Sequence, residues 1–143
     1  MSNSSQFAAR VTHRFRATPE AVFDAWLTGD KVRRWFAPGL GEMTRIAVEP
    51  RVGGSFLFAQ RRGLDEVEHL GKYVELIRPE RLAFTWQVKG TADTSRVAID
   101  IEPNNEGCEL TLVHELSPAW ENYVERTRAA WTKMLNAMAE ALG

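Results

Sequence analysis

The chain has 143 residues, a length that allows one domain with a substantial buried core. Its net charge is -1 at pH 7 and its charged residues are interspersed, so the sequence does not predict nucleic-acid binding. No apolar run is long enough to span a bilayer, the first six residues are polar and unlike a signal peptide, and the single cysteine cannot form an internal disulfide. We therefore expect a cytoplasmic, soluble protein with one domain over residues 1–143.

The first part of the chain predicts a strand followed by two short helices. Apolar and polar residues alternate over residues 7–15, the period of a half-buried strand. Thr18 and Pro19 are typical of a helix start, because threonine can accept from free N–H groups and proline has none to leave unpaired. Gly29 separates the two helices, and Pro38-Gly39 ends the second. Their apolar faces consist of Val22, Phe23, Trp26 and Leu27 in the first helix, and Val32, Trp35 and Phe36 in the second.

Six antiparallel strands are predicted next. The fourth of them alternates most clearly, whereas the third is apolar on both faces, so its inward face stays undetermined. A turn with Pro79 connects these two, and a hairpin over 103–107 connects the last two. The predicted strands cover residues 44–48, 55–58, 66–77, 81–88, 96–102 and 109–115. In the fourth strand, one face carries Leu82, Phe84, Trp86 and Val88.

A long C-terminal helix is predicted over residues 118–142, with Ser117 as its cap and Pro118 at its first position. It would be roughly 35 Å long, enough to cross the sheet. Its apolar stripe consists of Trp120, Val124, Trp131, Leu135, Met138 and Leu142. This order of elements predicts an α+β fold in which an antiparallel sheet curves around the long helix.

Few residues predict chemistry. The three histidines have no metal-ligand spacing, and no phosphate-binding or dinucleotide-binding loop occurs, so neither a metal site nor a cofactor is predicted. His114 is either a polar group of a cavity or a core histidine with its hydrogen bonds satisfied. Glu75 is either a carboxylate with a raised pKa inside a cavity or a partner of Arg81 or Arg96 in an ion pair.

The aromatic residues allow two interpretations: they fill the core, or several of them line a pocket between the sheet and the long helix. The second interpretation predicts binding of a small apolar or aromatic molecule, with His114 or Glu75 orienting it. The predicted ligand-binding residues are Trp35, Phe56, Phe58, Tyr73, Glu75, Phe84, Trp86, His114, Trp131 and Met138.

Four segments resemble one protein family. Residues 11–26 are similar to the opening of proteins related to the activator of the heat-shock-protein-ninety ATPase, within the START-like superfamily that includes birch-pollen-allergen-type proteins. Residues 33–39 resemble the family's Trp-x-x-Pro-Gly-like segment, 51–54 its Arg-x-Gly-Gly turn, and 130–138 its closing helix. Two positions depart from the pattern, with Ala130 where the family often has Gly and His13 where it often has Arg.

The resemblance implies the helix-grip fold and favours the pocket interpretation. It also implies two other functions: a co-chaperone-like partner of a heat-shock ATPase with a role in the stress response, and an enzyme of the polyketide cyclase or hydrolase type. The enzyme would need a positioned acid and base. No membrane partner is expected, and the sequence is compatible with a monomer or a homodimer.

Overall fold

The computed structural model describes residues 8–91, 94–116 and 122–143. The polypeptide forms seven strands and three helices in these ranges, close to the predicted order. The elements are β1 (Ala8–Phe15), α1 (Pro19–Leu27), α2 (Gly29–Trp35), β2 (Met43–Val48), β3 (Ser55–Arg62), β4 (Asp65–Ile77), β5 (Arg81–Val88), β6 (Ser95–Asn104), β7 (Gly107–Glu115) and α3 (Val124–Leu142). The predicted start of the last helix at Ser117 and Pro118, together with Trp120, lies outside the described residues.

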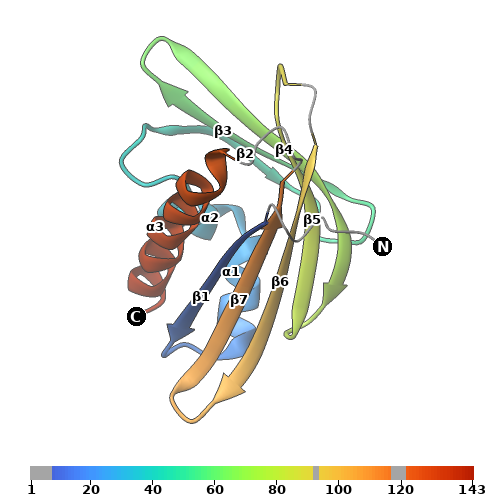
Figure 1. Ribbon diagram of the computed structural model, residues 1–143, viewed down its shortest axis with the longest axis vertical. Coiled ribbons are helices and arrows are strands. Elements are labelled where there is room, and N and C mark those ends of the chain that lie inside the picture. The colour runs from blue at the N-terminus through green and yellow to red at the C-terminus, as the bar shows by residue number, and fades with distance from the viewer. Residues whose placement is uncertain (1–7, 92–93, 117–121) are drawn as a thin grey trace.

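All seven strands form one sheet in the order β1-β7-β6-β5-β4-β3-β2, and every neighbouring pair is antiparallel. Figure 1 shows the sheet curving around α3, with α1 and α2 in the space that the curved sheet leaves open. Helix α3 contacts β1 and α2, while α1 contacts β6. The predicted α+β, helix-grip architecture is confirmed.

The predicted start of α1 is also confirmed. The Thr18 hydroxyl accepts a hydrogen bond from the Ala21 N–H at 3.1 Å, and Pro19 occupies the first helical position. The indole N–H of Trp35 in α2 donates to the Ala25 carbonyl of α1 at 2.9 Å. This bond fixes the two short helices against each other and holds the Trp35 ring inside the core.

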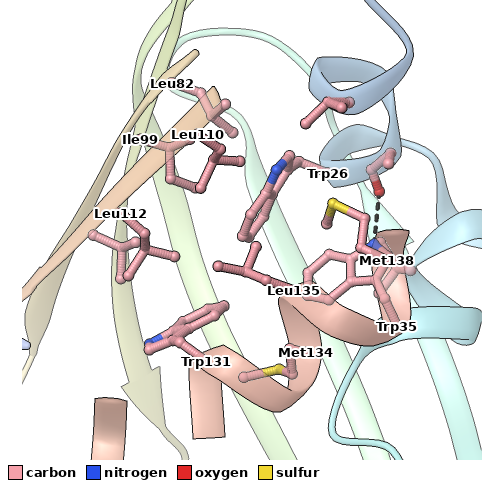
Figure 2. Close-up of a cluster of buried hydrophobic side chains, with 14 of the residues drawn as sticks. Trp26, Trp35, Leu82, Ile99, Leu110, Leu112, Trp131, Met134, Leu135 and Met138 are labelled. Carbon is pink, nitrogen blue, oxygen red and sulfur yellow. Dashed lines mark hydrogen bonds between the residues drawn. The ribbon is translucent and has the colours of Figure 1, made fainter. Parts of the chain in front are cut away.

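One face of α3 supplies the middle of the core. Figure 2 shows its side chains pointing between the strands and the two short helices. Trp131, Met134, Leu135 and Met138 are buried on this face, whereas the polar residues of α3 lie on the other. Facing them are Leu82, Ile99, Leu110 and Leu112 from the sheet, and Trp26 and Trp35 from the short helices. Among the described helices, none has the length and apolar character needed to cross a membrane.

A bulge in β4 explains why its inward face could not be predicted. The register with β5 shifts between Tyr73 and Glu75, so one extra residue interrupts the alternation. Tyr73 before the bulge and Leu76 after it both pack into the core, although one has an odd and the other an even number. Val74 and Ile77 are 40% and 48% exposed, and therefore lie on the outer side.

Candidate ligand-binding site

The centre of the molecule is an aromatic cluster that the sequence largely predicted. Seven of the ten predicted ligand-binding residues line one internal space, together with Trp26. The volume of this space is only about 10 Å³, the size of a single water molecule at most. The rings therefore pack against one another, and this part of the interior leaves no room for a ligand. The seven are Trp35, Phe56, Phe58, Tyr73, Phe84, Trp86 and Trp131.

Two polar atoms in this cluster have no hydrogen-bond partner among the described residues. They are the Tyr73 hydroxyl and the Trp26 indole nitrogen. Both side chains are almost completely buried, and burial raises the pKa of the Tyr73 hydroxyl. Gly71 makes room for the cluster, because a side chain there would collide with the ring of Phe56.

An open pocket of about 670 Å³ lies beside this cluster, between the first half of α3, the loop after α2 and the sheet. Trp86 and Trp131 line both spaces, and their rings are 5.5 Å apart, so this pair separates the pocket from the packed interior. Phe36 continues the aromatic wall, with its ring 5.9 Å from that of Trp86. Leu40, Val88 and Met134 add further apolar surface to the wall.

His114 stands behind the wall and holds Trp131 in place. The Trp131 indole N–H donates to His114 Nδ1 at 3.0 Å, and because an indole nitrogen can only donate, Nδ1 carries no proton. The other ring nitrogen, Nε2, therefore donates to the Ser95 hydroxyl at 2.7 Å, which in turn donates to the Trp86 carbonyl at 3.2 Å. Both nitrogens are thus occupied, so His114 positions the wall and has no nitrogen free to orient a ligand.

His69 is one of the polar residues of the wall that sequence reasoning missed, and Arg62 is another. Its Nδ1 lies 3.2 Å from the Phe58 carbonyl, which can only accept, so the proton is on Nδ1. The Nε2 atom then has a free lone pair, since the bond to Phe58 is the one hydrogen bond that the ring makes to the described residues. The ring lies 4.8 Å from that of Phe36 and lines the pocket. It lies on the inner face of β4 together with Tyr73, four residues along the strand, so the alternation that placed Tyr73 inside was the signal that could have found it.

Arg62 brings a positive charge to the same wall. Its Nε donates to the Oε1 atom of Gln60 at 2.7 Å. Gln60 is fully buried, and its Nε2 donates to the carbonyls of Ala37 and Gly41 at 3.0 and 3.1 Å. Gln60 thus connects β3 to the loop after α2 and fixes the direction of the Arg62 side chain. Ala37 has a φ of 42°, a conformation that this network helps to hold.

The structure does not bring the remaining two predicted residues to the pocket. Glu75 accepts a hydrogen bond from Arg81 at 2.8 Å, and Arg81 also pairs with Asp100, so the ion-pair interpretation of Glu75 is correct and its role in orienting a ligand is not supported. The bulge in β4 places Glu75 on the outer side of the sheet. Met138 is buried near Trp35, away from the open pocket.

Other parts of the described structure are less suited to bind an aromatic ligand than this pocket. A groove of about 640 Å³ on the outer face of the sheet has polar and apolar lining residues in similar number, and Phe56 is the one aromatic residue among those described. No group of three or more possible metal ligands is found within the described ranges. His13, which departs from the family pattern, contacts Asn136 of α3 at 2.8 Å and links β1 to that helix.

The two buried histidines predict a pH-dependent stability. Burial lowers the pKa of both His69 and His114 to about 4, below the ordinary value of about 6.5 that an unfolded chain has. The unfolded state therefore binds more protons between these values, and the free energy of unfolding should fall as the pH decreases from about 6.5 to about 4. The expected loss is up to about 3 kcal/mol for each histidine.

Urea unfolding at pH 7, 5.5 and 4.5 checks this prediction. The variants His69→Gln and His114→Gln serve as references, since each removes one titrating group. A wild-type free energy of unfolding that does not change over this range would contradict neutral, buried histidines.

Comparisons with known proteins agree with this architecture. Residues 16–143 match the profile of the family described as "Activator of Hsp90 ATPase homolog 1-like protein". The fold is similar to that of CV1439 from Chromobacterium violaceum (TM-score 0.83, 23% identity, 94% of this chain and 96% of that one). It is also similar to NE0264 from Nitrosomonas europaea, with a TM-score of 0.84 and 16% identity over 99% of this chain and 97% of that one. The AHSA1 protein SPO3351 from Silicibacter pomeroyi is similar as well, with a TM-score of 0.82 and 22% identity over 94% of this chain and 96% of that one. No curated protein matches the chain by sequence.

Proposed function

The chain belongs to the family of Activator of Hsp90 ATPase homolog 1-like proteins, and from the pocket on its helix-grip fold we propose that it binds a small apolar or aromatic molecule. The observation that carries this proposal is the aromatic wall of an open pocket of about 670 Å³. Pockets for small molecules are typically about 300–1,000 Å³ and are mainly apolar with a few polar groups.

The wall favours flat ligands. Trp86 is only partly buried although it is a large apolar residue, and its exposed part lies in the pocket. Phe36 and Trp131 flank it with ring centroids 5.9 and 5.5 Å away. A ligand ring entering between these residues could stack on one and meet another edge-on, the arrangements that aromatic pairs prefer. Met134 would adapt its flexible side chain to the shape of the ligand.

The pocket also offers the ligand one free acceptor, the Nε2 atom of His69. A single imidazole nitrogen at an aromatic wall supports orientation of a bound molecule. The described lining residues supply no carboxylate to complete an acid and base pair, so the geometry supports binding better than turnover. The heat-shock ATPase partner and the cyclase or hydrolase activity implied by the resemblance stay predictions, tested by pull-down and by turnover assays.

Filling the pocket should abolish binding. Ala130 is an exposed residue of α3 that lines the pocket, so Ala130→Phe adds a ring at the opening without disturbing the core. We expect a panel of two-ring aromatic compounds to quench tryptophan fluorescence and to raise the melting temperature of the wild-type protein, because Trp86 and Trp131 are in the wall. In Ala130→Phe the affinity should fall about tenfold or more.

Ala141→Phe is the matched control, because Ala141 is exposed on the same helix but borders a different depression near Met138. It should bind like the wild type. If no compound of the panel changes either the fluorescence or the melting temperature of the wild type, the proposed function is wrong. Equal weakening by the two variants would place binding elsewhere.

A further inference from the structure

We propose that the ligand of this pocket is an aromatic carboxylate and that Arg62 binds its carboxylate group. This inference rests on the proposed function and adds the chemical class of the ligand. It follows from the charges around the pocket, from the geometry of Arg62 and from the protonation of His69.

The charges around the pocket have one sign. The chain as a whole has a net charge of -1, with 19 acidic and 18 basic residues. The described residues that line the pocket nevertheless include three cations, Arg62, Arg126 and Lys133. No aspartate or glutamate is among these lining residues. Such a local excess of positive charge attracts an anion and raises its concentration at the opening. An aromatic wall combined with positive charge is complementary to a molecule with a flat apolar body and an anionic group.

Arg62 is the cation best placed to bind that group. Its side chain is partly buried, and burial lowers the pKa of the guanidinium, as expected for a charge without a compensating carboxylate. Arg62 forms no ion pair with any carboxylate of the described residues. On the outer face of the sheet, in contrast, Arg81 pairs with Glu75 and Asp100.

The hydrogen bond to Gln60 prepares Arg62 for a carboxylate. This bond uses Nε and leaves the two terminal nitrogens without partners among the described residues. Gln60 is itself held by two backbone carbonyls, so the guanidinium is oriented before a ligand arrives. A guanidinium with free terminal N–H groups binds a carboxylate through charge-assisted hydrogen bonds, the strong type in proteins.

The other polar residues that line the pocket are less suited than Arg62 to bind a carboxylate. His69 presents a lone pair to the pocket, which would repel a carboxylate oxygen. Arg126 lies over the Tyr123 ring at 5.1 Å, and both Arg126 and Lys133 are exposed, so water and salt screen their charges. The carboxylate is therefore assigned to Arg62, while the two exposed cations steer it toward the opening.

Two probes of nearly the same shape test the class of ligand. Isothermal titration calorimetry with 2-naphthoate and with neutral 2-naphthamide at pH 7 should give an affinity about tenfold or more higher for the naphthoate. Added salt should weaken binding of the naphthoate and leave that of the naphthamide unchanged. Arg62→Gln should reduce the preference for naphthoate to about twofold or less.

Arg61→Gln is the matched control, because Arg61 is the neighbouring arginine and is exposed. It should keep the wild-type preference, and melting temperatures should show that both variants fold. If naphthamide binds as tightly as naphthoate, the inference is overturned and the proposed function stands. If Arg62→Gln keeps the full preference, the assignment to Arg62 is overturned. If neither probe binds, the inference and the proposed function both fail. Should Arg62→Gln not fold, the two probes and the salt dependence on the wild type still decide the class of ligand.

Discussion

A chain that ends at Glu115 is expected to be insoluble or molten, because it lacks the helix that completes the core. Helix α3 buries four large apolar side chains, Trp131, Met134, Leu135 and Met138. Each contributes about 1.5–3 kcal/mol when buried, so together they are comparable with the whole net stability of a domain, about 5–15 kcal/mol. Their loss would also expose an apolar patch that promotes aggregation.

Circular dichroism, binding of a hydrophobic dye and the dispersion of amide signals check this result. A chain shortened only by Leu142 and Gly143 is the control and should fold, because the four buried residues remain. If the chain ending at Glu115 were monomeric, with cooperative unfolding and dispersed amide signals, the role assigned to α3 in the core would be wrong.

Trp131→Ala should lower the free energy of unfolding by about 3–5 kcal/mol. Trp131 is 2% exposed and contacts the rings of Trp26, Trp86 and His114, so its removal leaves a cavity that the surrounding rings cannot fill. The substitution also removes the donor to His114 Nδ1 and leaves that buried atom unpaired. Chemical denaturation measures the change.

Trp131→Phe separates the two effects. It keeps an aromatic ring but removes the indole N–H, so its cost should be smaller, about 1–3 kcal/mol. Glu140→Ala on the exposed face of α3 should change stability by less than about 0.5 kcal/mol. If Trp131→Ala cost less than about 1 kcal/mol, the ring would not be the anchor of α3 that the structure shows.

The sequence predicted the elements well where the apolar pattern was regular. Strand β5 pairs with β6 without a register shift, and its Leu82, Phe84 and Trp86 all face inward as predicted. The buried stripe of α3 was likewise predicted at Trp131, Leu135 and Met138. In both cases burial on one face imposes a period that can be recognised without knowing the partner element.

The inward face of β4 could not be predicted, because a bulge changes the period within the strand. Its position depends on pairing with β5, a long-range contact that the residues of β4 alone do not encode. Without the bulge, Tyr73 and Leu76 could not be assigned to the same face. Uninterrupted alternation would place Glu75 on the same face as Tyr73, and this is why the predicted site included Glu75, which lies outside. His69 precedes the bulge and shares the face of Tyr73, so continuing the alternation backward from Tyr73 would have found it.

The predicted aromatic residues lie together in the structure, but their packing differs from the expected one. Large rings such as Phe56, Tyr73 and Phe84 were expected to leave an open cavity, yet they interlock and leave about 10 Å³. The open pocket instead involves Arg62 at the end of β3 and Phe36 after α2, segments distant in sequence from the helix they face. The spacing of residues within one segment does not show which distant segments contact each other in the fold.

Locating a bound probe by nuclear magnetic resonance tests the central claim most directly. On titration of ¹⁵N-labelled protein with 2-naphthoate, the indole signals of Trp86 and Trp131 and the amide signal of His69 should shift together. Lys72 and Gln87, in the groove on the outer face of the sheet, should not change. Shifts confined to Lys72 and Gln87, or no shifts at all, would contradict a ligand pocket between α3 and the sheet.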